Sequence, residues 1–331
     1  MKKVLAFIFI LALVVGAVFA EAQQEYPARD INDIITWGAG GGTDTCNRII
    51  MQAMGDALGV NINCNNVTGG SGVVGLAAAY DKPADGYTLC GLSESNTTAA
   101  VRGWDQTMAV WDFFIVGGSP DVLSVTPDSP YKTLQELVEA SKKAPNKIKA
   151  GAAGSGSIHH LNLLAFQDGS GSKLAFIPYE GSAPSQNAAM TGEITVIITS
   201  AAEQAELIKA GKLRPLAMMT PDGFAIDAIK IGSSFDVYPE LKNYLPLGQQ
   251  IGFAVRKDTD PAIKAKLVDA FKAAMKVKAV QEFGSKNYYN LSGACGEEAN
   301  AIFKKLESKF SYTLFNLNAT KIDPATLGIQ K

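Results

Sequence analysis

The chain has 331 residues, of which 47% are hydrophobic and 19% charged, and its formal net charge is −2. That length is enough for two domains of roughly 100–200 residues each. The near balance of acidic and basic residues, without any basic block, argues against nucleic acid as a partner.

The first 22 residues have the pattern of a secretory signal peptide. Lys2 and Lys3 precede an unbroken apolar stretch over 4–15, and the −3 and −1 positions of a cleavage site follow as Val18 and Ala20 or as Ala20 and Ala22. The alternative is a membrane anchor, but this stretch is shorter than the roughly 20 residues of a membrane span. We therefore expect cleavage near Ala20 to Ala22 and a periplasmic mature protein.

The remainder alternates predicted strands and helices, in two successive units. Strand, helix, strand, helix and strand in this order are typical of a parallel α/β sheet. The pattern restarts after Pro127 and Pro130, so we expect two α/β domains. The first unit has strands at 33–37, 60–65 and 87–92 with helices at 43–58 and 73–80. The second has strands at 122–126, 147–150, 174–178, 194–199 and 213–219, with helices at 134–143, 158–166, 185–190 and 202–210; a strand at 250–255 and helices at 261–276 and 297–316 end the chain.

A glycine-rich loop follows the first predicted strand and reads W-G-A-G-G-G-T-D-T over 37–45. A dinucleotide fingerprint requires a third glycine where Thr43 stands, and a phosphate-binding P-loop requires a lysine that is missing. What remains is a helix N-terminus whose free N–H groups suit a single carboxylate. A plain tight turn is the alternative.

A second loop of the same character, G-A-A-G-S-G-S over 151–157, opens a helix in the second unit. Ser155 and Ser157 offer hydroxyl donors, and His159 and His160 fall in the first helical turn. The positive end of the helix dipole favours neutral imidazoles there. One packed and one solvated histidine is the alternative. Two facing loops of this kind would form a cleft for a small ligand.

The cysteines leave two readings open. Three of the four, Cys46, Cys64 and Cys90, fall near predicted element ends, so either one disulfide among them or buried free thiols is expected. With Cys295, their spacings match no zinc pattern, and the only two histidines are adjacent. We expect neither a metal nor a cofactor.

Seven segments taken together resemble one family, the extracytoplasmic substrate-binding proteins of tripartite tricarboxylate transporters, also called TctC or Bug proteins. They are G-G-G-T-D at 40–44 with Arg48, N-N-V-T-G-G-S-G at 65–72, K-P-A-D-G-Y-T-L at 82–89, S-P-Y-K-T-L-Q-E-L at 129–137, G-A-A-G-S-G-S-I-H-H-L at 151–161, P-Y-E-G-S-A-P at 178–184 and I-K-A-G-K-L-R-P-L-A at 208–217.

The resemblance implies an α/β, two-domain periplasmic-binding-protein fold of a type II-like kind, with a ligand cleft between the two domains. The first domain would comprise 23–124 and 246–331, and the second 125–245. Backbone N–H groups and hydroxyls of the glycine loops would hold a small carboxylate. By analogy the ligand-binding residues are Ala39, Gly41, Thr43 and Asp44 from the first domain, and Ser155, Ser157, His160, Gly181, Ser182 and Ser200 from the second.

Three residues depart from the family pattern and bear on the ligand. Trp37 stands where the family has a proline-containing approach, and it either walls the cleft or packs in the core. Glu94 lies in S-E-S-N-T-T, where the family is small and apolar. A Glu94 that points into the cleft would repel a dicarboxylate and favour a ligand with an amine. A solvated surface glutamate would have no effect on the choice of ligand. Glu203 raises the same question.

The expected function is that of a monomeric receptor, not an enzyme, that captures a mono-, di- or tricarboxylate, or an amino acid, by domain closure. It would deliver this ligand to integral membrane permease subunits. The alternatives are a ligand-binding sensor for a signalling system and an exported α/β enzyme that uses His159 or His160 as a base. The sequence supplies no G-x-S-x-G motif and no His-Asp-Ser grouping for such an enzyme.

Overall fold

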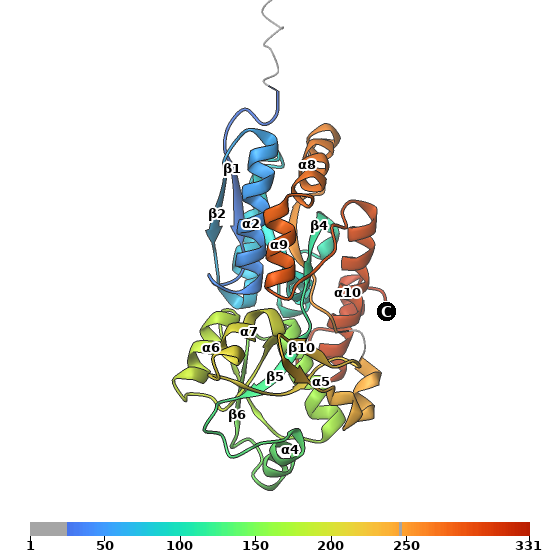
Figure 1. Ribbon diagram of the computed structural model, residues 1–331. Helices are drawn as coiled ribbons and strands as arrows, with labels where there is room; N and C mark the ends of the chain where they lie inside the picture. The colour runs from blue at the N-terminus through green and yellow to red at the C-terminus, as the bar shows by residue number, and fades with distance from the viewer. Residues whose placement is uncertain (1–24, 245–246) are drawn as a thin grey trace, which may run out of the picture.

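The structure is a computed structural model that describes residues 25–244 and 247–331. The expected signal peptide, 1–22, lies outside the described residues. The described chain forms two α/β domains, each built around its own β-sheet and stacked one above the other in Figure 1. The predicted fold class is confirmed.

The first domain contains a six-stranded mixed sheet. In the strand order β13-β4-β12-β3-β1-β2, β1 runs parallel to β2 and β3, whereas β12 is antiparallel to β3 and β4. The strands are β1 Ile31–Ile35, β2 Ile62–Asn66, β3 Thr88–Ser93, β4 Trp111–Gly118, β12 Ile251–Arg256 and β13 Asn290–Leu291. The helices are α2 Gly42–Leu58, α3 Val73–Tyr80, α8 Pro261–Ala274, α9 Lys278–Lys286 and α10 Glu297–Asn316.

Both faces of this sheet are covered, because its strands carry apolar side chains on both sides. On one face Phe114 stacks on Phe253 at 4.5 Å between ring centroids, and Phe271 of α8 packs edge-on against both. On the other face Phe113 stacks on Phe303 of α10 at 4.0 Å. These aromatic pairs fix α8 and α10 on opposite sides of the sheet.

The second domain contains a five-stranded sheet in the order β7-β6-β8-β5-β9. Its strands are β5 Asp121–Val125, β6 Lys149–Ala152, β7 Ala175–Pro178, β8 Val196–Ser200 and β9 Arg214–Met218, and a hairpin of β10 Phe224–Ile226 and β11 Ile229–Ile231 lies beside them. The helices are α4 Leu134–Lys143, α5 Ile158–Ser170, α6 Ser182–Met190 and α7 Ala201–Lys209. Short 3-10 turns are η1 Gly70–Gly72, η2 Glu94–Thr98, η3 Ala100–Arg102 and η4 Met108–Val110 in the first domain, η5 Ser234–Asp236 and η6 Pro239–Tyr244 after β11, and η7 Pro324–Leu327 near the C-terminus.

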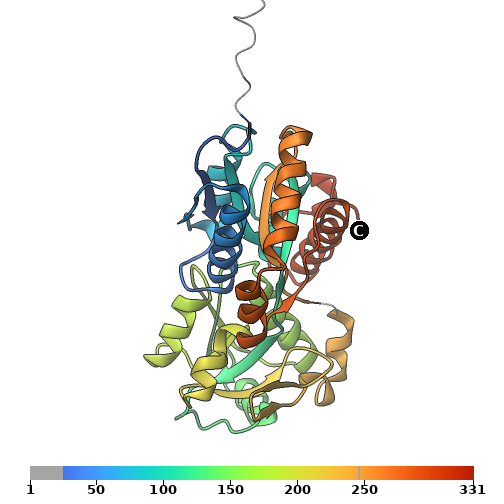
Figure 2. The same cartoon turned by 45° about the horizontal axis from the view of Figure 1, so that its top comes forward.

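The chain crosses from the first sheet to the second between β4 and β5, and it returns ahead of β12 (Figure 2). The domain boundary expected at 124 falls within β5. Because β5 pairs with β8 and β9 along 121–125, the whole strand belongs to the second sheet. The first crossing therefore lies at 119–120, a few residues before the expected boundary.

An apolar cluster joins the two domains on the α5 and α10 side. We call it the interdomain cluster, and it combines side chains of η3 and α10 from the first domain with side chains of α5 from the second. Its buried members are Ala100, Val101, Ile158, Leu161, Ala165, Leu247, Phe310, Leu314 and Ile329.

All four cysteines are free thiols. Cys46 belongs to the apolar cluster on one face of the first sheet and Cys90 to the cluster on the other face, so the sheet separates them. The Cys64 thiol donates a weak hydrogen bond to Asp33 at 3.8 Å. Of the two readings, the structure has the free thiols.

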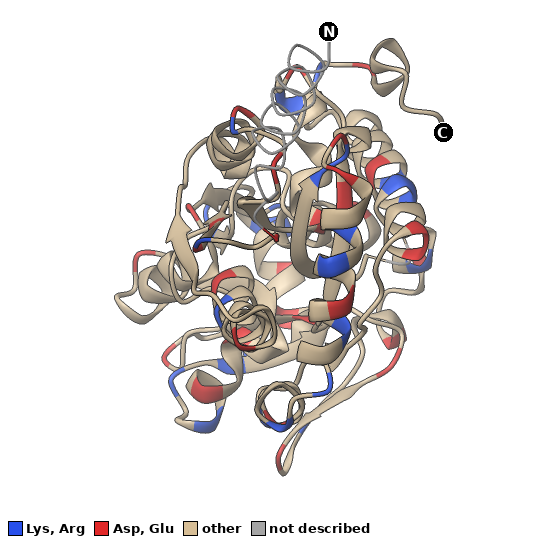
Figure 3. Ribbon diagram, turned by 90° about the horizontal axis from the view of Figure 1, so that it is seen from above, with Lys and Arg blue, Asp and Glu red and all other residues tan. Residues whose placement is uncertain are grey.

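Charged residues of both signs are interspersed along the helices of both domains (Figure 3). None of the helices in the described part of the chain has the length and apolar character that crossing a membrane requires.

A candidate ligand-binding site between the domains

The loops at the facing ends of the two sheets enclose a cavity of about 20 Å³. That space is comparable to a single water molecule and far below the roughly 300–1,000 Å³ of a typical ligand pocket. The two domains therefore lie close together at this cavity, which in this structure has room for about one water molecule. The first domain contributes Trp37, Gly38, Gly41, Gly42, Thr43, Ser93, Glu94, Ser95 and Gln249 to the wall, and the second contributes Ala153, His159, Gly181, Ser182 and Glu203.

The N-terminus of α2 forms one side of the cavity. Its N-cap residue, Gly41, has no side chain to cap the helix, so first-turn N–H groups remain free for other acceptors. Asp44 lies behind the loop, where it accepts hydrogen bonds from Gly40 N at 2.9 Å and from Arg48 Nε at 2.9 Å. Burial opposes ionisation of Asp44, but the bonds from Arg48, Gly40 and Asn66 hold its pKa below the usual value. Asp44 thus positions the loop and does not face the cavity.

The loop before α2 contacts the second domain directly. Gly38 N donates to Glu180 O at 3.1 Å, and a Cβ on Gly38 would lie only 2.7 Å from that oxygen. Trp37 is 5% exposed, lines the cavity and donates from Nε1 to Asn96 Oδ1 at 3.0 Å. It therefore combines the two roles considered for it, as a wall of the cleft and a buried side chain.

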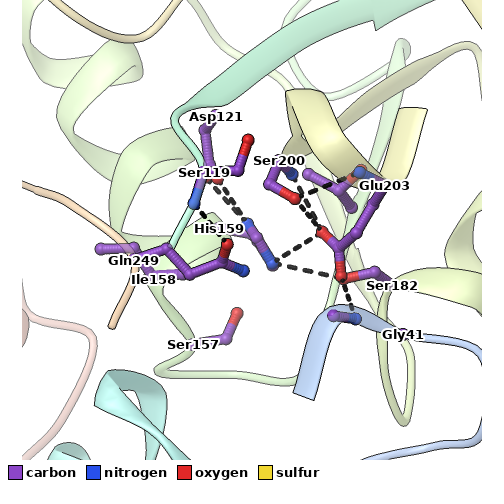
Figure 4. Close-up of polar contacts among 12 residues, drawn as sticks. Gly41, Ser119, Asp121, Ser157, Ile158, His159, Ser182, Ser200, Glu203 and Gln249 are labelled. Carbon is purple, nitrogen blue, oxygen red and sulfur yellow. Dashed lines mark hydrogen bonds and ion pairs between the residues drawn. The ribbon is translucent and has the colours of Figure 1, made fainter. Parts of the chain in front are cut away.

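Glu203 reaches across the domain boundary to α2. Its Oε1 accepts a hydrogen bond from Gly42 N at 2.7 Å. Its Oε2 accepts from Ser200 N at 3.0 Å and from Ser200 Oγ at 2.7 Å, which completes the capping box of α7. Figure 4 shows this carboxylate between Ser200 on one side and the α2 N-terminus on the other. Ser200 therefore lies behind Glu203 as an N-cap and does not line the cavity.

His159, in the first turn of α5, lies at the centre of the polar contacts in Figure 4. Its Nδ1 is 2.8 Å from Asp121 Oδ2, and its Nε2 is 3.2 Å from Ser182 Oγ and 3.6 Å from Glu203 Oε2. Burial alone would lower the pKa of His159, but Asp121, Glu203 and Glu94 together raise it to about 9. The neutral state expected from the helix dipole is wrong for His159, because the three carboxylates outweigh the dipole.

His160 faces away from the cavity. Its Nδ1 accepts a hydrogen bond from Gly156 N at 3.0 Å, and its ring stacks on Phe176 at 3.9 Å. Burial, together with the charge of Arg102, lowers the pKa of His160 to about 4, so this imidazole is neutral. Successive helical residues point about 100° apart, as 3.6 residues per turn dictates. His159 accordingly lines the cavity, where His160 was predicted to lie.

Glu94 is fully buried and lines the cavity, so the solvated surface position considered for it is wrong. Its Oε1 accepts from Ser95 Oγ at 2.7 Å, and its Oε2 accepts from Gln250 N. Burial raises the pKa of Glu94 to about 7, against the opposing effect of these hydrogen bonds.

Six of the twelve residues expected to bind the ligand line the cavity: Trp37, Gly41, Thr43, Glu94, Gly181 and Ser182. The other six do not. Ala39 and Ser155 are exposed, Asp44 and His160 hold their loops from behind, and Ser157 and Ser200 are the N-caps of α5 and α7.

Several wall residues had no part in the expected site. Gly42 could have been predicted from the sequence, because it stands at the start of a helix, where an N–H group without a partner inside the helix is expected. No sequence pattern identifies Gln249 as a wall residue, because it lies in the return crossing, more than 150 residues after the other first-domain wall residues.

Residues 46–304 match the sequence profile of the tripartite tricarboxylate transporter family receptor, TctC. Protein BugT of Bordetella pertussis is 30% identical over 293 residues, which cover 85% of this chain and 87% of BugT. A UPF0065 protein in the gbd 5′ region of Cupriavidus necator is 30% identical over 307 residues, 89% of this chain and 90% of that protein.

Solved structures share the fold. One described as a periplasmic transporter matches with a TM-score of 0.78 at 26% identity, over 88% of this chain and 97% of that chain. At lower identity, a Rhodopseudomonas palustris protein with adipate has a TM-score of 0.79 at 19% identity, over 89% and 99% of the two chains. MatC from Rhodopseudomonas palustris with bound malate has a TM-score of 0.78 at 18% identity, over 87% and 100%. The chain therefore belongs to the tripartite tricarboxylate transporter receptor family, whose members are periplasmic solute-binding receptors and not enzymes.

Proposed function

We propose that this chain binds a small organic acid in the interdomain cavity and delivers it to the membrane permease of a tripartite tricarboxylate transporter. The observation that carries the proposal is the shared wall of the cavity, to which both domains contribute polar groups. A ligand that contacts both domains binds the closed arrangement more tightly than the open one, and so it drives closure.

The chemistry of the wall suits a carboxylate. The cavity lies at the N-termini of α2, α5 and α6, which begin at Gly42, Ile158 and Ser182. Helix N-termini attract anions because their first N–H groups have no partner within the helix and the helix dipole is positive there. Thr43, which is 6% exposed, brings a hydroxyl without a hydrogen-bond partner among the described residues.

The structural relatives with adipate and with malate support the same ligand class, since both molecules are small organic acids. They match this chain in fold at 18–19% identity, and so they support the class and not a particular ligand. Delivery to a permease is proposed from the family alone.

Calorimetric titration of the chain from residue 23 onward with mono-, di- and tricarboxylates and amino acids tests the proposal. For whichever acid binds, Thr43→Ala should weaken affinity roughly tenfold or more, as expected for a lost hydrogen bond to a charged group. Ser155→Ala is the matched control, because Ser155 is exposed and outside the cavity. The proposal fails if no acid binds, or if Thr43→Ala and Ser155→Ala bind equally well.

A further inference from the structure

The Glu203 carboxylate occupies the position on α2 that a ligand carboxylate would take. Its Oε1 lies 2.7 Å from Gly42 N, within the 2.7–2.9 Å range of charge-assisted hydrogen bonds. Gly42 is the first residue of α2, where the N–H group has no partner inside the helix. A carboxylate from the second domain therefore satisfies an anion site of the first.

Glu203 is held firmly in this position. Its side chain is 5% exposed, and its second oxygen is bound by both the backbone and the hydroxyl of Ser200. His159 Nε2 lies 3.6 Å from the same oxygen. A ligand carboxylate that reached Gly42 N would have to displace a buried side chain with partners on two domains.

Helix capping alone does not account for this arrangement. The chain has a second capping box of the same type at α4, where Glu136 is the capping glutamate. Glu136 is exposed, and its Oε2 takes both local N–H groups, those of Lys132 and Thr133. In Glu203, by contrast, Oε2 completes the cap of α7, and Oε1 accepts a hydrogen bond from Gly42 N of the first domain.

The charges around the cavity also indicate that Glu203 affects which ligand can bind. Among the described residues of the wall, His159 alone is a cation, and Asp121 already pairs with it from behind at 2.8 Å. Glu203 remains as a carboxylate that faces this small space, and Glu94, whose raised pKa leaves it partly ionised near neutral pH, faces the same space. A dicarboxylate would bring further negative charge to this space, which like charges oppose, whereas an ammonium group would balance it.

We infer that Glu203 selects the charge of the ligand: as a built-in carboxylate on α2, it makes the cleft favour a zwitterionic, amino-acid-type ligand over di- and tricarboxylates. The inference rests on the proposed function, because it names the ligand class of the same site. The ammonium group lies toward Glu94 and Glu203, and the hydroxyls of Thr43 and Ser182 are left for a single ligand carboxylate.

The test compares matched ligand pairs by calorimetry on wild type and on Glu203→Gln. Each neutral L-amino acid is paired with the acid that lacks only its ammonium group, and asparagine is also paired with succinate. In wild type the ammonium-bearing member should bind at least tenfold more tightly, and Glu203→Gln should reduce that ratio roughly tenfold, the effect of one hydrogen bond to a charged group. The Gln side chain retains an oxygen for Gly42 N.

Glu206→Gln is the matched control, because Glu206 lies one turn along on α7, is 80% exposed and pairs with Lys209. It removes the same charge from the same helix and should leave the ratio unchanged. If Glu203→Gln does not fold, Glu94→Gln replaces it with the same expectation.

The outcomes separate the inference from the proposed function. Tighter binding of dicarboxylates than amino acids by wild type, or an unchanged ratio in Glu203→Gln, overturns the inference and leaves the receptor function intact. Absence of binding by every acid and amino acid, in wild type and in the variant, overturns both.

Discussion

Replacing Gly38 with Ala tests whether the contact between the β1–α2 loop and the β7–α6 loop belongs to the ligand-bound state. Gly38 N donates to Glu180 O at 3.1 Å, and the added Cβ would lie 2.7 Å from the same oxygen. The φ of Gly38 is outside the left-handed region, so alanine fits the local backbone. The substitution therefore acts on the approach of the domains and not on the loop itself.

The expected magnitude follows from these distances. An ordinary contact begins at 3.4 Å, so the two loops must separate by 3.4 − 2.7, about 0.7 Å. The lost hydrogen bond contributes about 1 kcal/mol, and the steric strain contributes about 1 kcal/mol or more. Because the contact joins two domains, about 2 kcal/mol opposes closure, which corresponds to roughly 30-fold weaker ligand binding.

Calorimetry with whichever small acid binds wild type measures this change, and small-angle X-ray scattering should show a larger radius of gyration. Gly232→Ala is the control, since its Cβ would meet no atom within 4 Å. Wild-type affinity in Gly38→Ala would refute the reasoning, because the ligand-bound state would then not contain the contact.

Three further predictions concern stability. The pKa of His159 is raised to about 9, so its contribution is complete below about pH 6.5 and is lost as the pH rises through 9; NMR titration of the imidazole and melting curves against pH measure this, and a pKa near 6.5 would contradict it. Burial raises the pKa of Asp33 to about 7, so wild type should lose stability as the pH rises from about 4 through 7; Asp33→Asn should flatten that slope, and an equal slope in both proteins would exclude Asp33 as its source. Phe271→Ala, which removes a fully buried ring packed on Phe114 and Phe253, should lower the free energy of unfolding by about 3–5 kcal/mol; denaturant titration measures it, and a loss below 1 kcal/mol would mean that the core repacks.

Local signals in the sequence were enough to predict much of the fold. The α4 helix is found at its expected residues, 134–143, since Thr133 and Glu136 form a capping box around an amphipathic stretch. The glycine loop predicted α2, which starts one residue earlier than expected and ends at Leu58 with Gly59 in the left-handed conformation. The β4 strand was missed, although six of its eight residues are buried, because the strand is apolar on both faces and shows no alternation.

The candidate site depends on information that is not local. Whether His159 or His160 faces the cleft is a question of helix rotation, and the facing Asp121 that settles it is 38 residues away in the chain. Glu203 reaches Gly42 across 161 residues, a contact that exists only once both domains have folded and met. The glycine loops could be predicted because the start of a helix is a local sequence pattern. The grouping of Glu94, His159 and Glu203 could not, because it exists only in the assembled cleft.

The interdomain cluster has a consequence for how affinity is set. It lies at the return crossing, where Leu247 packs with side chains of α5 and α10, and it includes no residue of the cavity wall. Exposure of its apolar surface to water would cost free energy, so we expect a rotation that opens the cavity to pivot near this cluster. Substitutions such as Phe310→Leu would alter the population of the closed state, and apparent affinity scales with that population. We therefore expect a substitution in α10 that leaves every wall residue of the cavity unchanged to alter ligand affinity without altering which ligand is recognised.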